Sequence, residues 1–185
     1  MQSSQPLVVL VSGAPGSGKT TLGSRLADDT GSAFVSKDVL KERLADAEGP
    51  PPDVAASKAL GARAYDELFT TLRDHVAGGR GVVVESNFRR GHSEPELIAA
   101  LAGRPARVVH CVAAPTTIEE RYRSRAGNRH PAHLDALRIE DVRDDLERGR
   151  YAALDLGMPT LQVDTSASYR PSYEAILSFV RSRGA

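Results

Sequence analysis

The 185-residue sequence has a single cysteine, no tryptophan and no excess of charge of either sign. A lone cysteine excludes an internal disulfide and suits a reducing compartment. Lys plus Arg and Asp plus Glu both number 24, so no overall positive field favours nucleic acid. Four Phe and five Tyr also leave few rings for stacking on bases. These scarcities disfavour a nucleic-acid partner, although a local basic patch remains compatible with a neutral total.

The sequence also lacks a long hydrophobic run. The apolar run at 7–11 has no basic region before it, so we interpret it as a strand and not as a signal peptide. No stretch approaches the length of a membrane span. With 41% hydrophobic and 26% charged residues, the composition is ordinary for a globular protein. We therefore expect one soluble, cytoplasmic domain over residues 1–185, with no membrane partner.

What the sequence does contain is a nucleotide-binding loop in the right setting. Gly13, Gly18, Lys19 and Thr20 fit the pattern G-x-x-x-x-G-K-[ST] without a gap. The β-branched run at 7–11 precedes the loop and predicts a buried parallel strand. Leucines four residues apart follow it and indicate a helix. Strand, loop and helix in this order favour phosphate binding over a glycine-rich turn without a ligand.

The loop suits a triphosphate for physical reasons. Its glycines let consecutive N–H groups face the phosphates, and the helix N-terminus adds a partial positive charge. Lys19 would reach the β- and γ-phosphates, and the Thr20 hydroxyl would hold Mg²⁺. The residues predicted to contact the nucleotide here are Gly13, Ala14, Pro15, Gly16, Ser17, Gly18, Lys19, Thr20 and Thr21.

Strand-like and helix-like segments alternate along the whole chain. The strands are expected at 7–11, 32–36, 81–86, 106–113 and 160–164. The helices are expected at 21–27, 37–47, 54–77, 94–102, 116–126, 137–154 and 173–183. Apolar strands separated by helices predict an α/β fold, with a parallel sheet covered on both faces. Cys111 falls within the fourth strand, and we expect it to be buried there and not to be a nucleophile.

A carboxylate follows the second predicted strand, at Asp38. Ligands of open parallel sheets bind at this edge, where the strands end. A carboxylate there faces the γ-phosphate and can accept the proton of a hydroxyl acceptor. The alternative is that Asp38 caps the helix beginning at Val39, and both roles can hold at once.

A second carboxylate, Glu85, closes the third strand and is followed by Ser, Asn and Phe. This is the place of a Walker-B acid near Mg²⁺. Alternatively, Glu85 caps a helix or pairs with Arg89 or Arg90. Asn87 would orient an acceptor hydroxyl or a phosphate. Phe88 suits either a wall of the acceptor pocket or the core.

Arginines recur every four residues at Arg121, Arg125 and Arg129. On a helix this spacing places three guanidinium groups on one face, which could close over the phosphates and neutralise their growing charge. The alternative is a solvated basic face paired with acids such as Glu119. We interpret residues 121–136 as a lid, with Arg125 as the first candidate for contact with the transferring phosphate and Arg121 as the second.

Two histidines in the same region, His130 and His133, have H-x-x-H spacing. Neither a cysteine nor a third ligand accompanies them. We interpret them as residues of the lid and not as zinc ligands.

Together, the loop, Asp38, the Glu85 segment and the arginine lid resemble the small P-loop kinases of the zeta-toxin and AAA-type ATPase-like group. That group includes the kinase half of polynucleotide kinase and the chloramphenicol phosphotransferase. The resemblance covers about residues 6–165. It implies a core similar to that of nucleoside monophosphate kinases, with strand order 2-3-1-4-5, ATP and Mg²⁺ as donor, an aspartate base at Asp38 and lid arginines at Arg121 and Arg125.

Two positions depart from that pattern. Lys41 stands where polynucleotide kinases place an arginine, which puts a polynucleotide acceptor in doubt. Glu85 stands where many P-loop enzymes have aspartate.

These observations favour an ATP-dependent kinase acting on a hydroxyl of a small molecule. The residues predicted to bind the acceptor are Asp38, Lys41, Ser86, Asn87 and Phe88, and Arg129 is added to the nucleotide contacts. The loop at 166–171 is expected beside the nucleobase of the bound nucleotide.

One alternative acceptor is a nucleic-acid 5′-hydroxyl or a nucleotide-sugar. A second alternative is a nucleotide-dependent switch without an acceptor, which leaves Asp38 unexplained. A nucleoside monophosphate kinase suits the sequence less well, because its acceptor phosphate needs no general base.

Overall fold

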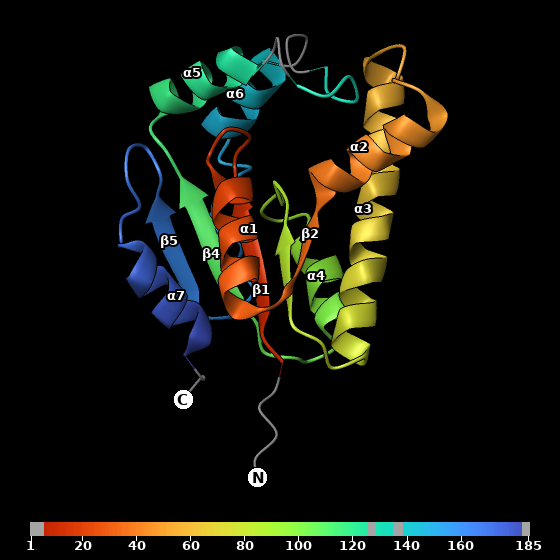
Figure 1. The fold of residues 1–185 in the computed structure, drawn as a ribbon. Coiled ribbons are helices and arrows are strands. Elements are labelled where there is room, and N and C mark those ends of the chain that lie inside the picture. The colour runs from red at the N-terminus through yellow and green to blue at the C-terminus, as the bar shows by residue number, and fades with distance from the viewer. Residues whose placement is uncertain (1–5, 126–128, 135–138, 183–185) are drawn as a thin grey trace.

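A parallel sheet of five strands, in the order β2-β3-β1-β4-β5, forms the centre of the molecule (Figure 1). The computed structural model describes residues 6–125, 129–134 and 139–182. The strands are β1 (Val8–Gly13), β2 (Ala33–Ser36), β3 (Val82–Glu85), β4 (Arg107–Val112) and β5 (Thr160–Asp164). The observed order confirms the one that the resemblance implies.

Helices cover both faces of the sheet, as the alternating pattern predicts (Figure 1). They are α1 (Lys19–Thr30), α2 (Lys37–Glu48), α3 (Val54–Ala77), α4 (Glu94–Leu101), α5 (Pro115–Arg125), α6 (Ile139–Glu147) and α7 (Tyr173–Arg181). None of them, within the residues that the structure describes, is long and apolar enough to cross a membrane.

The central strand, β1, is buried along its whole length and pairs with β3 on one side and β4 on the other. Leu10, for example, is aligned with Val84 and Val108. A strand with neighbours on both edges and helices on both faces meets apolar groups everywhere, which explains its continuous apolar run. The nucleotide-binding loop therefore leaves the sheet from its most buried strand.

Two apolar clusters hold the helices on the sheet. On one face, Leu68 and Leu72 of α3 pack with side chains of β1, β3 and α4. On the other face, Leu22 of α1 and Ile176 of α7 pack against alternate residues of the same strands. Cys111 belongs to this second cluster and is buried, which confirms the prediction, and burial raises its thiol pKa to about 12.

The helix predicted at 137–154 is wrong in its second half; residues 137–138 lie outside the described part of the chain. α6 ends at Glu147, and Gly149 follows with φ +63°. The N–H of Arg150 donates to the Asp145 carbonyl and that of Gly149 to the Leu146 carbonyl. These bonds form a Schellman motif, which stops the helix. The chain then turns, and Tyr151 and Leu154 are buried without helical structure.

Candidate active site

The nucleotide-binding loop turns tightly as it leaves β1 at Gly13. A Cβ at this position would lie 2.4 Å from the Cys111 carbonyl oxygen and 2.5 Å from Ser17 Oγ. The φ of Gly13 is +146°, which other residues rarely adopt. Only glycine fits here, so the loop folds back closely against the end of β4.

The first turn of α1 then presents backbone N–H groups to the site. The helix begins at Lys19 after Gly18, which has no side chain to cap it. The N–H groups of an opening turn have no acceptor in a preceding turn. Leu22 is the first residue whose N–H reaches back, to the Gly18 carbonyl, while the N–H of Ser17 donates to the Ala14 carbonyl. This helix terminus is a ready site for an anion.

Lys19 and Glu85 lie side by side next to this turn. Lys19 Nζ donates to the Ala14 carbonyl at 3.2 Å and lies 3.6 Å from Glu85 Oε1. Glu85 Oε2 accepts hydrogen bonds from Ser36 Oγ at 2.7 Å and from Thr20 Oγ1 at 3.3 Å. Burial raises the pKa of Glu85, and the neighbouring Lys19 and hydroxyl groups offset only part of that effect.

The oxygen atoms around Glu85 fit a hard cation. A buried carboxylate and two hydroxyl groups supply the kind of oxygen ligands that Mg²⁺ prefers. Among the described residues, Glu85 pairs with Lys19 and not with Arg89 or Arg90, and Arg89 Nη2 instead lies 2.5 Å from Asp145 Oδ2.

Asp38 lies in the first turn of α2, which begins one residue before it. Asp38 Oδ2 accepts a hydrogen bond from Arg129 Nη2 at 2.5 Å, and Oδ1 lies 3.7 Å from Lys37 Nζ. Burial alone would raise the pKa of Asp38, but the positive charge around it holds that pKa well below its usual range. The charges responsible are those of Lys37, His133, Arg129 and Lys19.

Residues 129–134, which we call the lid segment, lie against α2 and α3. His133 Nε2 lies 2.9 Å from Glu42 Oε1, and His130 Nε2 lies 2.9 Å from Asp46 Oδ1. With the Arg129 contact to Asp38, these pairs follow one face of α2 at successive turns. Each histidine thus has a carboxylate partner on α2.

The lid segment also contacts α3 through its backbone. Ser57 Oγ donates to the Ala132 carbonyl at 3.0 Å and accepts from Lys41 Nζ at 2.6 Å. The Ala132 side chain is fully buried beside Ala45 and Leu60. The lid segment is therefore closed over α2 and α3 in this structure.

The predicted arginine face is correct only in part. Arg121 and Arg125 belong to α5, one turn apart, whereas Arg129 lies in a bend beyond the helix. Residues 126–128 and 135–136 of the predicted lid lie outside the described residues. Arg129 consequently faces Asp38 on α2 and does not extend the basic face of α5.

Two pockets share the nucleotide-binding loop. The larger, of about 460 Å³, lies between α1, α5 and the loop after β5. Its lining is Gly16, Gly18, Lys19, Thr20, Thr21, Arg121, Arg125, Thr165, Ala167, Ser168 and Tyr169. Ala167, Ser168 and Tyr169 belong to the loop at 166–171, which the sequence predicts to lie beside the nucleobase.

Thr165 is a residue of this pocket that sequence reasoning missed. Its hydroxyl donates to the Ser17 carbonyl at 2.8 Å, and Arg121 Nη2 donates to its carbonyl at 2.6 Å. Arg121 is thereby tied to the loop after β5. Arg125, whose Nε donates to the Arg121 carbonyl at 3.1 Å, lines both pockets. No motif marks Thr165, although its position just after β5 was a usable signal.

The second pocket contains Asp38 and has a volume of only about 50 Å³. Its lining is Pro15, Gly16, Lys19, Thr20, Lys37, Asp38, Lys41, Asn87, Tyr122, Arg125, Arg129, His133, Val142 and Tyr151. Of the residues predicted to bind the acceptor, Asp38, Lys41 and Asn87 meet here.

Ser86 and Phe88 are absent from that lining among the described residues. Ser86 Oγ donates to Tyr65 Oη at 2.8 Å, and Tyr65 Oη donates to the Asn87 carbonyl at 3.3 Å. Burial raises the pKa of Tyr65 to about 12, so its hydroxyl keeps its proton. Phe88 is 1% exposed and packs with Tyr65 and Phe69 in the core.

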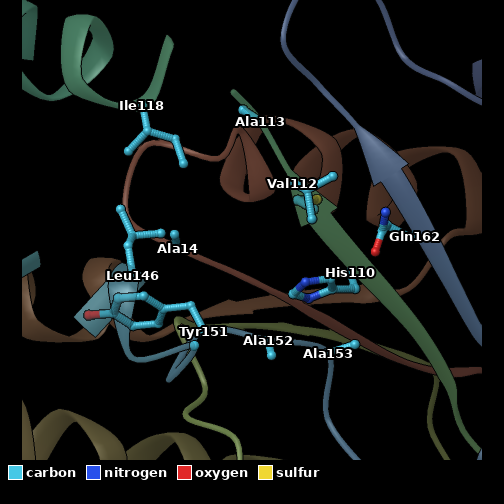
Figure 2. A pocket seen from close by; sticks show the side chains of 12 residues that line it. Ala14, His110, Val112, Ala113, Ile118, Leu146, Tyr151, Ala152, Ala153 and Gln162 are labelled. Carbon is cyan, nitrogen blue, oxygen red and sulfur yellow. The ribbon is translucent and has the colours of Figure 1, made fainter. Parts of the chain in front are cut away.

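A separate cavity of about 330 Å³ lies behind the nucleotide-binding loop (Figure 2). Its walls are mostly apolar, with Ala14, Ile118 and Leu146 on one side, and the His110 ring projects into it. His110 Nδ1 lies 3.0 Å from Ser12 Oγ, and burial lowers the pKa of the imidazole. Sequence reasoning assigned no role to this cavity.

Comparison with known proteins places this site among P-loop proteins. Residues 8–148 match a protein-family profile described as an AAA domain. A solved structure from Chloroflexus aurantiacus, of a protein provisionally described as a kinase, is 33% identical, with a TM-score of 0.85 over 96% of this chain and 98% of that one. These matches confirm the resemblance stated from the motifs.

Two further relatives carry kinase names. The shikimate kinase of Corynebacterium diphtheriae is 40% identical over 89 residues, which are 44% of this chain and 49% of that protein. The chain thus spans about half the length of this curated relative. A sugar kinase from a Janibacter species is 17% identical, with a TM-score of 0.64 over 95% of this chain and 94% of that one, and shares the fold alone.

Proposed function

The chain belongs to the AAA domain family, and on that premise we propose that it is an ATP-dependent kinase that phosphorylates a hydroxyl group of a small molecule. The observation that carries this proposal is that Lys19 of the nucleotide-binding loop and the carboxylate of Asp38 line one pocket. A phosphate-binding lysine and a base beside one another are what transfer to a hydroxyl requires. The proposal takes residues 1–185 as one kinase domain.

The donor side of the site is assigned to α1 and α5. The free N–H groups at the start of α1 and the Lys19 ammonium would hold the β- and γ-phosphates. Arg125 lines both pockets, which supports it as the guanidinium that would meet the transferring phosphate, while Arg121 fixes α5 to the loop after β5. The larger pocket then takes the rest of the nucleotide.

Mg²⁺ fits the oxygen atoms of Thr20 and Glu85. When bound, this ion neutralises charge on the β- and γ-phosphate oxygens. Glu85 contributes by orienting the Thr20 hydroxyl, and Ser36 and Lys19 hold Glu85 in place. These residues keep the carboxylate of a buried strand pointing at the phosphate site.

Asp38 is assigned as the base in the transfer of the γ-phosphate. The acceptor hydroxyl oxygen bonds to the γ-phosphorus as the bond from that phosphorus to the β–γ bridging oxygen breaks, and ADP leaves. The hydroxyl proton passes to the Asp38 carboxylate. The lowered pKa of Asp38 keeps this group ionised at neutral pH but weakens it as a base, and loss of the Arg129 contact would raise that pKa. Arg129 must first leave Oδ2, and the γ-phosphate offers it a stronger anion.

The closed lid segment indicates an order of events. A volume of about 50 Å³ is too small for an acceptor, because small-molecule sites usually have about 300–1,000 Å³. The acceptor therefore enters only after residues 129–134 separate from α2. Reclosure would then exclude water from the transferring phosphate, which prevents hydrolysis of ATP.

ADP release in the presence of Mg²⁺ and ATP tests this function. We expect one class of hydroxyl compound among sugars, polyols, hydroxy acids and nucleosides to stimulate release. Asp38→Asn should abolish the stimulation, and Lys19→Ala should abolish nucleotide binding. Asp66→Asn and Lys58→Ala, at exposed positions of α3, serve as matched controls. A slow hydrolysis that no acceptor and no change at Asp38 affects would favour the switch alternative, and stimulation by a 5′-hydroxyl oligonucleotide alone would favour the polynucleotide acceptor.

A further inference from the structure

The pocket around Asp38 is strongly cationic. Among the described residues that line it, five side chains are permanently cationic at neutral pH and a single one is a carboxylate. The cations are Lys19, Lys37, Lys41, Arg125 and Arg129, and the carboxylate is Asp38. A donor triphosphate accounts for some of these charges, and the question is whether it accounts for all of them.

The two pockets divide these cations between donor and acceptor. Lys19 and Arg125 also line the larger pocket and so face the donor phosphates. Lys37 and Lys41 line the smaller pocket and are absent from the lining of the larger one. Both belong to α2, one turn apart, and stand on either side of Asp38 in the sequence. The acceptor side therefore has its own pair of ammonium groups.

The surroundings of Lys41 keep its ammonium at the pocket. Lys41 is 2% exposed, and its Nζ donates to Ser57 Oγ at 2.6 Å. Removing an ammonium from water is costly unless hydrogen bonds or an anion replace the lost solvent. The ammonium group of Lys41 thus lies at the lining of the pocket, where it would attract an anion that enters.

Lys37 is positioned by the small and aromatic residues of α3. Its Nζ lies 5.7 Å from the Tyr65 ring centroid, and a Cβ added at Gly61 would lie 3.5 Å from that nitrogen. The bare backbone at Gly61 and the flat ring leave room for the ammonium group beside Asp38. This explains one of the small residues of α3 without assigning it to the acceptor itself.

The charges of the described side chains that line the pocket sum to a positive value. An anion that enters beside Asp38 is repelled by that carboxylate but attracted by the five cations, which outnumber it. A cationic acceptor, such as an amino sugar, meets the opposite balance and is repelled.

We propose that the acceptor carries an anionic group, a carboxylate or a phosphate, beside the hydroxyl that is phosphorylated, and that Lys37 and Lys41 bind this group. The inference rests on the proposed kinase function. Asp38 takes the hydroxyl, and the ammonium groups on either side of it along α2 take the anion. This arrangement fixes which hydroxyl of the acceptor meets the γ-phosphate.

Matched acceptors that share a carbon skeleton and differ in one terminal group, neutral or anionic, test the substrate class. Glycerol, glycerate and glycerol 3-phosphate form one such series, and glucitol, gluconate and glucitol 6-phosphate form a larger one. We expect kcat/KM for ADP release to be at least about tenfold higher with the anionic members. The carboxylate and phosphate members of each series distinguish the two sources of the anion.

Variants of α2 test the assigned residues. Lys37→Met and Lys41→Met should raise KM for the anionic acceptor by about tenfold or more while KM for ATP stays unchanged. Lys58→Met, at an exposed position, is the matched control. Thermal unfolding and ATP binding of each variant verify that it is folded. Unchanged KM values in both folded variants would overturn the assignment.

A binding measurement separates the failure of this inference from failure of the kinase function. The enzyme is saturated with Mg²⁺ and a non-hydrolysable ATP analogue and titrated with glycerate, gluconate, glycerol 3-phosphate and glycerol in a calorimeter. One outcome is that the anions bind to wild type, and about tenfold more weakly to Lys41→Met, while no acceptor stimulates ADP release. That result would support the anion site and reject the kinase function. Neutral acceptors phosphorylated as efficiently as the anionic ones would retain the kinase and reject the anion site. Absence of both anion binding and stimulation would reject the anion site as well.

Discussion

Arg129 Nη2 lies 2.5 Å from Asp38 Oδ2, so the carboxylate assigned as the base is held by a residue of the lid segment. The pair joins positions far apart in the chain, one in the first turn of α2 and one beyond α5. As long as this ion pair persists, the oxygen that would accept the acceptor proton is occupied. Opening of the lid segment would therefore also free the Asp38 oxygen that the proposed transfer step uses.

Removing Arg129 should raise the pKa of Asp38. One of the cations that lower it would be lost, while the burial that raises it would remain. We expect Arg129→Met to shift the midpoint of the Asp38 carboxyl titration upward, as followed by ¹³C NMR without nucleotide. Arg123→Met, which removes an exposed arginine paired with Glu119, is the control. An unchanged midpoint in Arg129→Met would show that the ion pair is absent in solution.

Asp38 should also give stability a defined pH dependence. Its folded pKa lies below its unfolded value near 3.8, so the folded state favours the ionised form. This contribution is fully present above the unfolded value and is lost as the pH falls toward the folded one. Between about pH 6 and about pH 3, the unfolding free energy of wild type should therefore fall more steeply than that of Asp38→Asn. Denaturant unfolding at each pH measures the difference, and parallel curves would contradict it.

Glu85→Gln should weaken the response to Mg²⁺ more than nucleotide binding itself. The amide keeps the size of the side chain but removes the charge beside the Thr20 hydroxyl. Loss of a group that orients a metal ligand typically costs about 10–100-fold in metal affinity. Nucleotide affinity titrated against Mg²⁺ should thus require at least about tenfold more ion in the variant. Binding in EDTA is the internal control and should change little.

Substitutions at Phe88 distinguish a role in the core from a role in binding the acceptor. Its ring is buried against Tyr65 and Phe69, so Phe88→Ala should cost about 3–5 kcal/mol of unfolding free energy. Phe88→Leu keeps most of the volume, should be milder, and leaves folded enzyme for kinetics. We expect its acceptor KM to equal that of wild type. A changed KM with unchanged stability would instead place Phe88 at the acceptor.

Gly13→Ala should be far more damaging than Gly31→Ala. Both positions have positive φ, but the new Cβ at Gly13 collides with the Cys111 carbonyl, whereas nothing lies within 4 Å of one at Gly31. The cost at Gly31 is the backbone strain alone, about 1–2 kcal/mol. Chemical denaturation of the two variants compares this strain with the collision and the less accessible φ at Gly13. Equal losses would mean that the loop can shift away from β4.

The parts of the fold that follow from local rules could be predicted from the sequence. α3 begins after Asp53, whose carboxylate accepts from the Ala56 N–H, and ends before a pair of glycines, so both of its bounds agree with the prediction. The end of α6 does not follow from such local rules. A glycine followed by apolar residues, as at Gly149, can continue a helix or close it, and the tertiary position of Tyr151 decides.

The site was predictable to the extent that strand ends determine it. Asp38 and the nucleotide-binding loop follow strands, Glu85 ends one, and all three meet at one edge of the sheet. The partners of these groups were not predictable, since Arg129 was assigned to a helical face by spacing that the chain does not maintain. Side-chain pairs between remote segments, such as Thr165 with Ser17, depend on packing that leaves no periodic trace in the sequence.

The central position of β1 implies a gradient of hydrogen-exchange protection across the active site. The nucleotide-binding loop is anchored to β1, whose N–H groups become accessible to solvent only when the sheet itself unfolds. The amide hydrogens of β1 should therefore exchange at the slow rate of global unfolding. The lid segment is held mainly by side-chain contacts to α2 and α3 and should exchange by local opening. The site that binds the phosphates and the segment that admits the acceptor would then open at different rates.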